Sequence, residues 1–312
     1  MRHTSHHPKS GPARATLYQE ITDRVLHQLE RGSVPWVQPW DGARSPLGLP
    51  VNALSGRRYS GINILILWDA VTTRTFGSQR WLTFRQALSV GGHVRKGEHG
   101  TTVCYADRFV PKDEQTRASE DGDEPNSIPF LKRFTVFNVE QCEDLPKSIL
   151  PELPPLAECE TVPAADALIC ATGADFRIGG GEAFYHRGED FIRVPHQTAF
   201  FDQINYFRTC FHELGHWTGH ASRLARDLAH RFGSEGYARE ELVAEIASAF
   251  LCASLAIQPT VRHADYIAEW LKILKNDNRA IFQAASMASK ASDFILGFVE
   301  REAQATDASE AA

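Results

Sequence analysis

Long hydrophobic runs are absent from this chain of 312 residues, since no apolar stretch approaches the roughly 18 residues of a membrane-spanning helix. The N-terminus is largely polar and lacks the apolar centre of a secretory signal peptide. We therefore expect no membrane association and a cytoplasmic location.

Cysteine is also scarce. The six cysteines are scattered and form neither a Cys-x-x-Cys pair nor an evident disulfide framework. Reduced thiols in a cytosol fit this pattern best, and no cysteine has the spacing of a metal ligand.

Basic residues are fewer than acidic ones. The chain has 33 Lys and Arg and 39 Asp and Glu, which gives a net charge of −6. This balance argues against indiscriminate nucleic-acid binding by the whole molecule but does not exclude a local basic patch. Residues 14–108 depart from the balance, because they hold 12 basic and 7 acidic residues, an excess of five positive charges. The same stretch holds four of the six tryptophans: Trp36, Trp40, Trp68 and Trp81.

Basic residues interleaved with aromatic ones suit single-stranded DNA, because phosphates need cations and unstacked bases need flat rings. The alternative is a small α+β domain whose aromatic side chains form its core and whose arginines face solvent. Spacing alone does not decide between the two interpretations. The candidate DNA-binding residues are Arg57, Arg58, Tyr59, Trp36, Trp40, Trp81, Arg85, Arg95 and Lys96.

The chain length predicts two domains. A stretch rich in proline and acidic residues at 146–163 is the natural linker, which gives domains at 14–145 and 164–302. Helical and alternating apolar patterns in the first domain, and helical patterns with one hairpin in the second, predict an α+β protein. We expect helices at 17–29, 62–70, 81–87, 164–171, 200–211, 237–250, 264–275 and 279–299, strands at 101–110, 130–139 and 191–194, and a flexible insertion at 111–129.

The chemistry of the chain centres on the motif His212-Glu213-Leu214-Gly215-His216. Two histidines four residues apart lie on one face of a helix, where both imidazoles can bind one metal ion. Glu213 lies beside them and can take a proton from a metal-bound water, whose pKa zinc lowers to about 7. Glu213 is therefore the candidate general base.

A second segment supplies candidate acidic ligands. Glu241 and Glu245 lie one helical turn apart in a largely apolar helix, where unpaired carboxylates are costly and a metal with its histidines would explain both. The arrangement resembles that of the gluzincins. By this analogy, Glu241 binds the metal and Glu245 orients a ligand histidine. Zinc is the expected cofactor, with another divalent metal such as Mn²⁺ as the alternative.

The metzincin motif is the alternative for the third ligand. That family requires a further histidine six residues after the second one, and this chain has Ser222 there. His220 stands two residues early. We expect it to be a polar residue near the helix end, where the dipole favours a cation, and not a ligand.

Taken together, the motifs resemble the ArdC-like antirestriction proteins over residues 18–298. The marks are Val34-Pro35-Trp36, Gly61-Ile62-Asn63, Trp81-Leu82-Thr83-Phe84, the segments 95–100 and 134–138, and the metal segments 212–220 and 239–245. The resemblance implies an N-terminal domain that binds single-stranded DNA, joined to a zincin-like metallopeptidase domain. It also implies carriage by plasmids or other mobile elements and protection of DNA that enters by conjugation. In zincin-like folds, a strand ahead of the active-site helix forms the edge on which a peptide lies, and we expect 191–194 in that place.

Three hypotheses follow. The first is an antirestriction protein with single-stranded DNA as partner and a gluzincin-type zinc site that cuts a peptide or protein. The second is a DNA-binding or masking factor with a non-proteolytic metal site. The third is a DNA-stimulated protease that acts on DNA-bound proteins. Structural zinc sites usually have four closed protein ligands, often thiolates, so the cysteine pattern and Glu213 favour an open site of the catalytic type.

Overall fold

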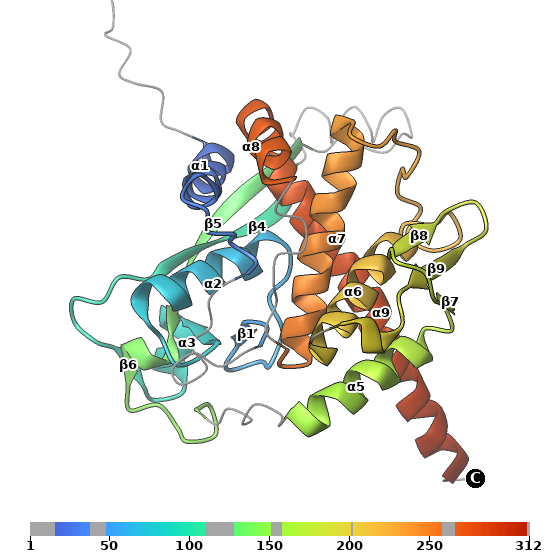
Figure 1. The fold of residues 1–312 in the computed structure, drawn as a ribbon. Coiled ribbons are helices and arrows are strands. Elements are labelled where there is room, and N and C mark those ends of the chain that lie inside the picture. Colours follow the sequence, from blue (N-terminus) through green and yellow to red (C-terminus); the bar gives the residue numbers. More distant parts are fainter. Residues whose placement is uncertain are drawn as a thin grey trace, which may run out of the picture.

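The computed structural model describes residues 16–37, 48–109, 128–150, 158–200, 202–257 and 266–310. Helices and small sheets alternate along the N-terminal half, whereas helices dominate the C-terminal half (Figure 1). Within the described residues, no helix combines the length and the apolar character that crossing a bilayer requires. The expected α+β organisation is confirmed.

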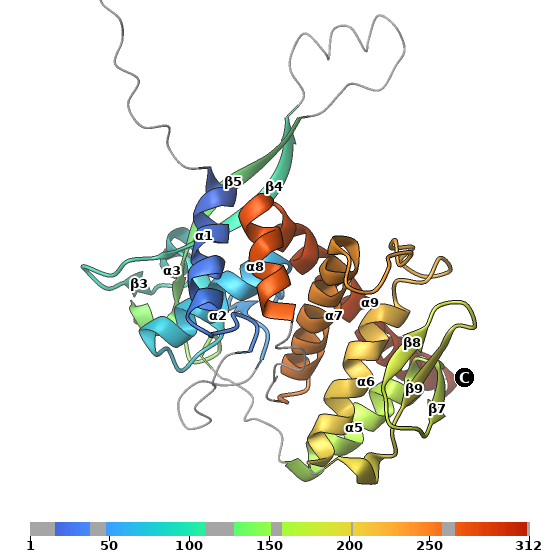
Figure 2. The same ribbon diagram turned by 45° about the horizontal axis from the view of Figure 1, so that its top comes forward.

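The N-terminal half is built on a four-stranded sheet in the order β1-β2-β5-β4. Its strands β4 and β5 form a long antiparallel hairpin, visible in Figure 2 as the pair that extends from the body. Helices α1 and α2 cover this half, and a two-stranded sheet of β3 and β6 lies at its edge. The elements are α1 (Leu17–Glu30), β1 (Val51–Asn52), α2 (Ile62–Arg74), β2 (Arg80–Thr83), α3 (Phe84–Ser89), β3 (His93–Val94), β4 (Thr101–Phe109), β5 (Ile128–Asn138), η1 (Val139–Gln141) and β6 (Cys142–Glu143).

The C-terminal half packs a three-stranded sheet, in the order β7-β9-β8, against a group of helices. Helix α7 runs through the middle of the molecule, with α6 on one side, α8 on the other and α9 passing behind (Figure 1). The elements are α5 (Glu158–Ala171), β7 (Asp175–Ile178), β8 (Phe184–His186), β9 (Phe191–Val194), η2 (Gln197–Ala199), α6 (Gln203–Trp217), α7 (Glu235–Ser254), α8 (Ile267–Asn276) and α9 (Ala280–Glu310).

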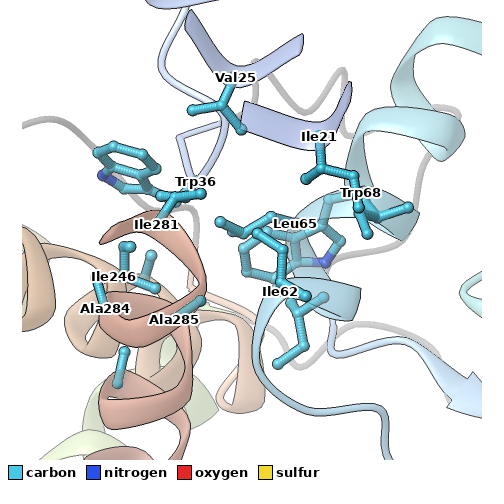
Figure 3. Close-up of a cluster of buried hydrophobic side chains, with 14 of the residues drawn as sticks. Ile21, Val25, Trp36, Ile62, Leu65, Trp68, Ile246, Ile281, Ala284 and Ala285 are labelled. Atoms are coloured by element: carbon cyan, nitrogen blue, oxygen red, sulfur yellow. The ribbon is translucent and has the colours of Figure 1, made fainter. Parts of the chain in front are cut away.

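One hydrophobic core joins the two halves. Figure 3 shows Trp68 of α2 and Ile21 of α1 in the same cluster as Ile246 of α7 and Ile281 of α9. Aromatic pairs cross the boundary, with ring centroids 5.5 Å apart for Trp36 and Trp270 and 5.6 Å apart for Trp68 and Phe250. Because burial of such side chains contributes much of a core's stability, we expect the two domains to depend on each other for stability.

Polar contacts reinforce this junction. Gly61 precedes α2 with a positive φ of 60°, and its N–H donates a hydrogen bond of 2.7 Å to the Ser289 hydroxyl of α9. Thr22 of α1 donates a hydrogen bond of 2.8 Å to the carbonyl of Asn278. The entrance to α2 is therefore fixed directly against the C-terminal helix.

Several sequence-based boundaries differ from the structure; the helix expected at 200–211, for example, is α6 and begins at Gln203. Residues 81–83, expected to open a helix, belong to β2, and the helix begins only at Phe84, where Thr83 caps it with a capping box. The segment expected as a linker is partly structured, because Ile149 is buried with Leu82 and Val139, and α5 begins at Glu158. The expected insertion at 111–129 lies almost wholly outside the described residues.

Candidate functional site

The motif helix α6 places its two histidines as their spacing predicts. His212 and His216 lie one turn apart, and their Nε2 atoms are 3.2 Å from each other. The His212 side chain is 2% exposed and that of His216 is 13% exposed. Both imidazoles therefore converge on one buried point.

Helix α7 brings the third donor to this point. The Glu241 carboxylate lies 3.4 Å from Nε2 of His212 and 3.4 Å from Nε2 of His216. One ligand atom from each of the three residues falls within 4.8 Å of the others. Gly215 permits this approach, because a Cβ there would lie 3.1 Å from the Cα of Ala244 on α7.

The electrostatics of the group are strongly coupled. Burial raises the pKa of Glu241, but hydrogen bonds to His212 and His216 outweigh it and hold that pKa well below its usual range. Burial lowers the pKa of His216, but hydrogen bonds to Glu240 and Glu241 outweigh it and raise that pKa well above its usual value. The donors are thus arranged to balance a positive charge among them.

Glu240 is a functional residue that the sequence reasoning missed. One of its carboxylate oxygens lies 3.3 Å from Nδ1 of His216, the ring atom that faces away from the cluster. Arg226 in turn donates to both Glu240 oxygens, over 2.7 Å from Nη2 and 3.1 Å from Nε. Carboxylates behind ligand histidines fix the ring and raise its basicity. The sequence does show that Glu240 directly precedes the expected ligand Glu241, and this pair of adjacent carboxylates could have indicated a supporting role for Glu240.

Glu245, expected in that orienting role, is buried at 2% exposure on α7, one turn beyond Glu241. The carboxylate that contacts Nδ1 of His216, on the side away from the cluster, is Glu240, and the part assigned to Glu245 remains a prediction. His220 lies outside the cluster, with its Nδ1 2.8 Å from the Ser222 hydroxyl. A ligand role for His220 thus finds no support among the described residues.

A cavity of about 180 Å³ opens at the three donors. Glu213 lines it beside His212, and Tyr237 lines it from the first turns of α7. Burial, followed by the charge of Glu241 and a hydrogen bond to it, raises the pKa of Tyr237 above its usual range. The phenol therefore stays protonated and can donate a hydrogen bond.

Strand β8 lines the same cavity through Phe184 and Tyr185, which corrects the expected edge strand. The expected strand is β9, but β9 is central, paired in parallel with β7 and antiparallel with β8. The edge beside the cavity is β8, because the hairpin turn at 187–190 carries the chain back inward to β9. A larger cavity of about 700 Å³ shares His230 and Glu240 with the first one.

The candidate DNA-binding residues separate into two groups. Arg57, Arg58 and Tyr59 line a cavity of about 400 Å³ in the N-terminal half. Arg85 and Lys96 are exposed and do not line that cavity. Arg95 is exposed too, but its guanidinium lies 2.7 Å from the Glu98 carboxylate, which offsets its charge.

The tryptophans belong to the core. Trp36 and Trp81 are completely buried, so neither indole presents a face on which a base could stack, and this part of the prediction is wrong. Tertiary packing places these large apolar rings inside, as it does Trp68. Trp40 lies outside the described residues. Among the described side chains of this half, the exposed aromatic ones are instead Tyr105, Phe134 and Phe84, at 58%, 47% and 51% exposure.

The donor set fits a divalent metal. Two imidazoles and one carboxylate are the ligands of open zinc sites, which leave a position for water or substrate. Burial of a carboxylate between two histidines is costly unless the charges are balanced. The group is thus the place in the described structure where a divalent ion would be held.

Two family models match the chain. The N-terminal domain of the anti-restriction factor ArdC matches residues 15–137, and a zincin-like metallopeptidase matches residues 163–287. A DNA primase TraC of Escherichia coli is 39% identical over 307 residues, which are 92% of this chain and 28% of TraC. The protein y4eC of Sinorhizobium fredii is 36% identical over 285 residues, which are 89% of this chain and 91% of y4eC. The chain therefore spans less than a third of the TraC primase.

Two crystal structures of the antirestriction protein ArdC from plasmid R388 also match. The metal-free structure is 38% identical, covers 91% of this chain and 98% of that one, and has a TM-score of 0.77. The Mn(II)-bound structure covers the same shares with a TM-score of 0.74. Fold and site together define an ArdC-type N-terminal domain joined to a zincin-like metallopeptidase domain, which implies a divalent metal.

The chain belongs to the ArdC family of antirestriction proteins, as its motifs predicted.

Proposed function

We propose that this protein protects DNA entering a cell from restriction, that it binds single-stranded DNA with its N-terminal domain, and that it hydrolyses a peptide or protein at its metal site. The observation that carries the hydrolytic part is the convergence of His212, His216 and Glu241 beside Glu213 in one cavity. The DNA part is supported by its relatives, an ArdC from a plasmid and two TraC primases.

The chain supplies the groups that hydrolysis requires. A divalent ion held by the three donors would supply Lewis acidity toward a carbonyl oxygen. Glu213 can accept the proton of an attacking water at its carboxylate, and Tyr237 can donate a hydrogen bond to developing negative charge. Arg226 and Glu240 hold the ring of His216 in place.

The surroundings suit a polypeptide. Among the described strands, β8 pairs with β9 alone, so its other edge can exchange main-chain hydrogen bonds with an extended peptide. The cavity of about 700 Å³ beyond His230 and Glu240 gives room for residues on one side of the scissile bond. Zinc is the proposed ion, and manganese is the alternative because an ArdC structure holds Mn(II).

The test is Glu213→Gln, which keeps the shape of the side chain and removes the proton acceptor. The variant should fold, hold its metal and bind DNA as the wild type does. Its proteolysis of a denatured protein, assayed with and without single-stranded DNA, should fall by about 10²–10⁴-fold or more. The control is Glu235→Gln, the same change at a carboxylate at the start of α7 that is 65% exposed and pairs with Arg239.

Wild-type proteolysis in Glu213→Gln would overturn the assignment of the general base. The same variant, introduced into recipient cells that restrict an incoming plasmid, tests whether the chemistry is needed for protection. Intact protection would show that DNA binding defeats restriction without hydrolysis.

A further inference from the structure

The cavity of about 400 Å³ in the N-terminal half is formed where three parts of the chain meet. The loop ahead of α2 contributes Arg57 and Arg58, the turn into α3 contributes Thr83 and Gln86, and the β4–β5 hairpin contributes Tyr105 and Phe134. Its volume lies within the range of about 300–1,000 Å³ that is usual for small-molecule sites. This cavity shares no lining residue with the cavity of about 180 Å³ at the metal centre, so the two are separate sites.

Two aromatic side chains of this cavity, Tyr105 and Phe134, are exposed, whereas Tyr59 is half-buried. Tyr105 and Phe134 form an edge-to-face pair with ring centroids 6.2 Å apart, while 58% and 47% of the two residues remain exposed. In the hairpin register, Val103 lies opposite Phe134 and Lys132 lies opposite Tyr105, so the two rings are diagonal neighbours on one face. Exposed aromatic rings in a concave surface can receive a flat ring by stacking.

The charge of the cavity favours a polyanion. Of the described residues that line it, two are arginines, both exposed, and none is acidic, in a chain whose net charge is −6. The metal cavity shows the opposite balance, since Glu213, Glu240 and Glu241 line it. Phosphates of a nucleic acid bind where cations are not offset by carboxylates.

The amide groups of the cavity are already engaged by the protein. Asn63 donates to the carbonyl of Cys104 and accepts from its N–H, both over 2.7 Å. Asn52 and Gln86 hydrogen-bond each other over 3.0 Å. Amides held in this way are poorly placed to read the edge of a base, so recognition here would depend on stacking, which tolerates any base.

We propose that this cavity holds an unstacked base of single-stranded DNA. Tyr105 and Phe134 form the stacking surface, and Arg57 and Arg58 contact phosphates on either side of the bound nucleotide. The inference rests on the proposed binding of single-stranded DNA and assigns it a place. A base paired in a duplex cannot enter such a cavity without unpairing, so single strands bind better than duplex.

The experiment measures binding of fluorescein-labelled oligodeoxythymidylate to the full-length protein, and of an abasic oligonucleotide of equal length. Tyr105→Ala with Phe134→Ala should weaken binding of oligodeoxythymidylate by about 5- to 100-fold, the loss expected for one stacked base. The double variant should bind the abasic strand as the wild type does. Arg57→Ala with Arg58→Ala should weaken binding of both strands and reduce the salt dependence.

Phe84→Ala is the matched control. Phe84 is exposed to the same degree as Phe134, lies in the same half and also makes an edge-to-face pair, with Phe137, but it does not line the cavity. It should leave both affinities unchanged. Tyr105→Phe should retain binding within about twofold, because the phenol hydroxyl is not needed for stacking. Thermal melting of each variant checks that the fold is intact.

Three outcomes would overturn the proposal. Equal binding of oligodeoxythymidylate by the wild type and the Tyr105/Phe134 double variant would place the base elsewhere while DNA binding stands. An equal loss in Phe84→Ala would show a general effect of surface aromatics. If the wild type binds neither strand, the proposed DNA binding fails with it.

Discussion

The metal centre and the N-terminal cavity are built in opposite ways. At the metal centre, His212 and Glu241 are almost fully buried, and the Glu241 carboxylate lies 3.4 Å from Nε2 of both histidines. In the cavity, Arg57, Arg58, Tyr105 and Phe134 project from exposed positions. Buried partners fix a geometry before a ligand arrives, whereas exposed side chains can follow a flexible strand. The first construction suits an ion with strict geometry and the second suits single-stranded DNA.

The core beneath both sites is shared, and breaking it should give the largest effect. Trp68 is completely buried and packs on Phe250 of α7, the helix that also carries Glu241. Trp68→Ala should lower the free energy of unfolding by about 3–5 kcal/mol, because a large buried ring leaves a cavity. Denaturant unfolding of the full chain measures the change.

The control for this change is again Phe84→Ala, whose exposed ring should alter the free energy of unfolding by no more than about 0.5 kcal/mol. If Trp68→Ala were equally mild, the two domains would be more independent than the shared core indicates. Residues 14–145 expressed alone should likewise be unstable, since Trp36 and Trp68 would lose Trp270 and Phe250.

The metal centre should respond more moderately to the loss of its supporting carboxylate. Glu240→Gln removes the charge that contacts His216 and pairs with Arg226. Changes to such supporting groups typically weaken metal affinity by about 10–100-fold. A titration with Mn²⁺ or Zn²⁺ followed by calorimetry checks this, with Glu235→Gln as the control. Unchanged affinity would show that Glu240 serves only the packing of the Arg226 loop.

We expect the smallest effect, a change in the stability of the fold, from Asp190 in the turn between β8 and β9. A hydrogen bond from Arg223 is the main cause that holds the pKa of Asp190 below its usual range. A carboxyl with a depressed folded-state pKa adds stability above its unfolded pKa of about 3.9, and this stability is lost as pH falls through the folded pKa. Since Asp190 is 36% exposed, Asp190→Asn should cost less than about 1 kcal/mol at pH 7.

Asparagine is a suitable replacement there, because Asp190 has a positive φ of 54°, which asparagine tolerates. The melting temperatures of the wild type and Asp190→Asn should converge as the pH is lowered. A difference that grew toward acid would contradict the depressed pKa of Asp190.

Helical spacing made the metal site predictable from the sequence. His212 and His216 are fixed one turn apart by the backbone alone, and the carboxylates of α7 are conspicuous in an apolar helix. Long helices such as α1 and α7 were expected close to their observed bounds from apolar residues at helical spacing, and the β4–β5 hairpin from apolar residues in alternation.

Tertiary packing set the parts that spacing could not predict. A tryptophan in the sequence suits a core and a stacking surface equally, and only the fold shows that Trp36 and Trp81 are inside while Tyr105 is outside. The orienting role of Glu240 depends on how α7 is rotated against α6 at Gly215. Strand β9 is central because the short strand β7 pairs with it in parallel. The two strands are separated in sequence by β8, so the hairpin pattern alone does not predict this pairing.

If His212, His216 and Glu241 hold one divalent ion, a titration of metal into the full-length protein should show it. We expect about one Zn²⁺ or Mn²⁺ per chain in the wild type and no binding after His212→Ala with His216→Ala. It also predicts a weaker affinity in Glu241→Gln than in Glu245→Gln, since Glu241 contacts both histidines. Full metal occupancy in the double histidine variant would contradict the site, and the reverse order of the two glutamines would show that Glu245 is the ligand.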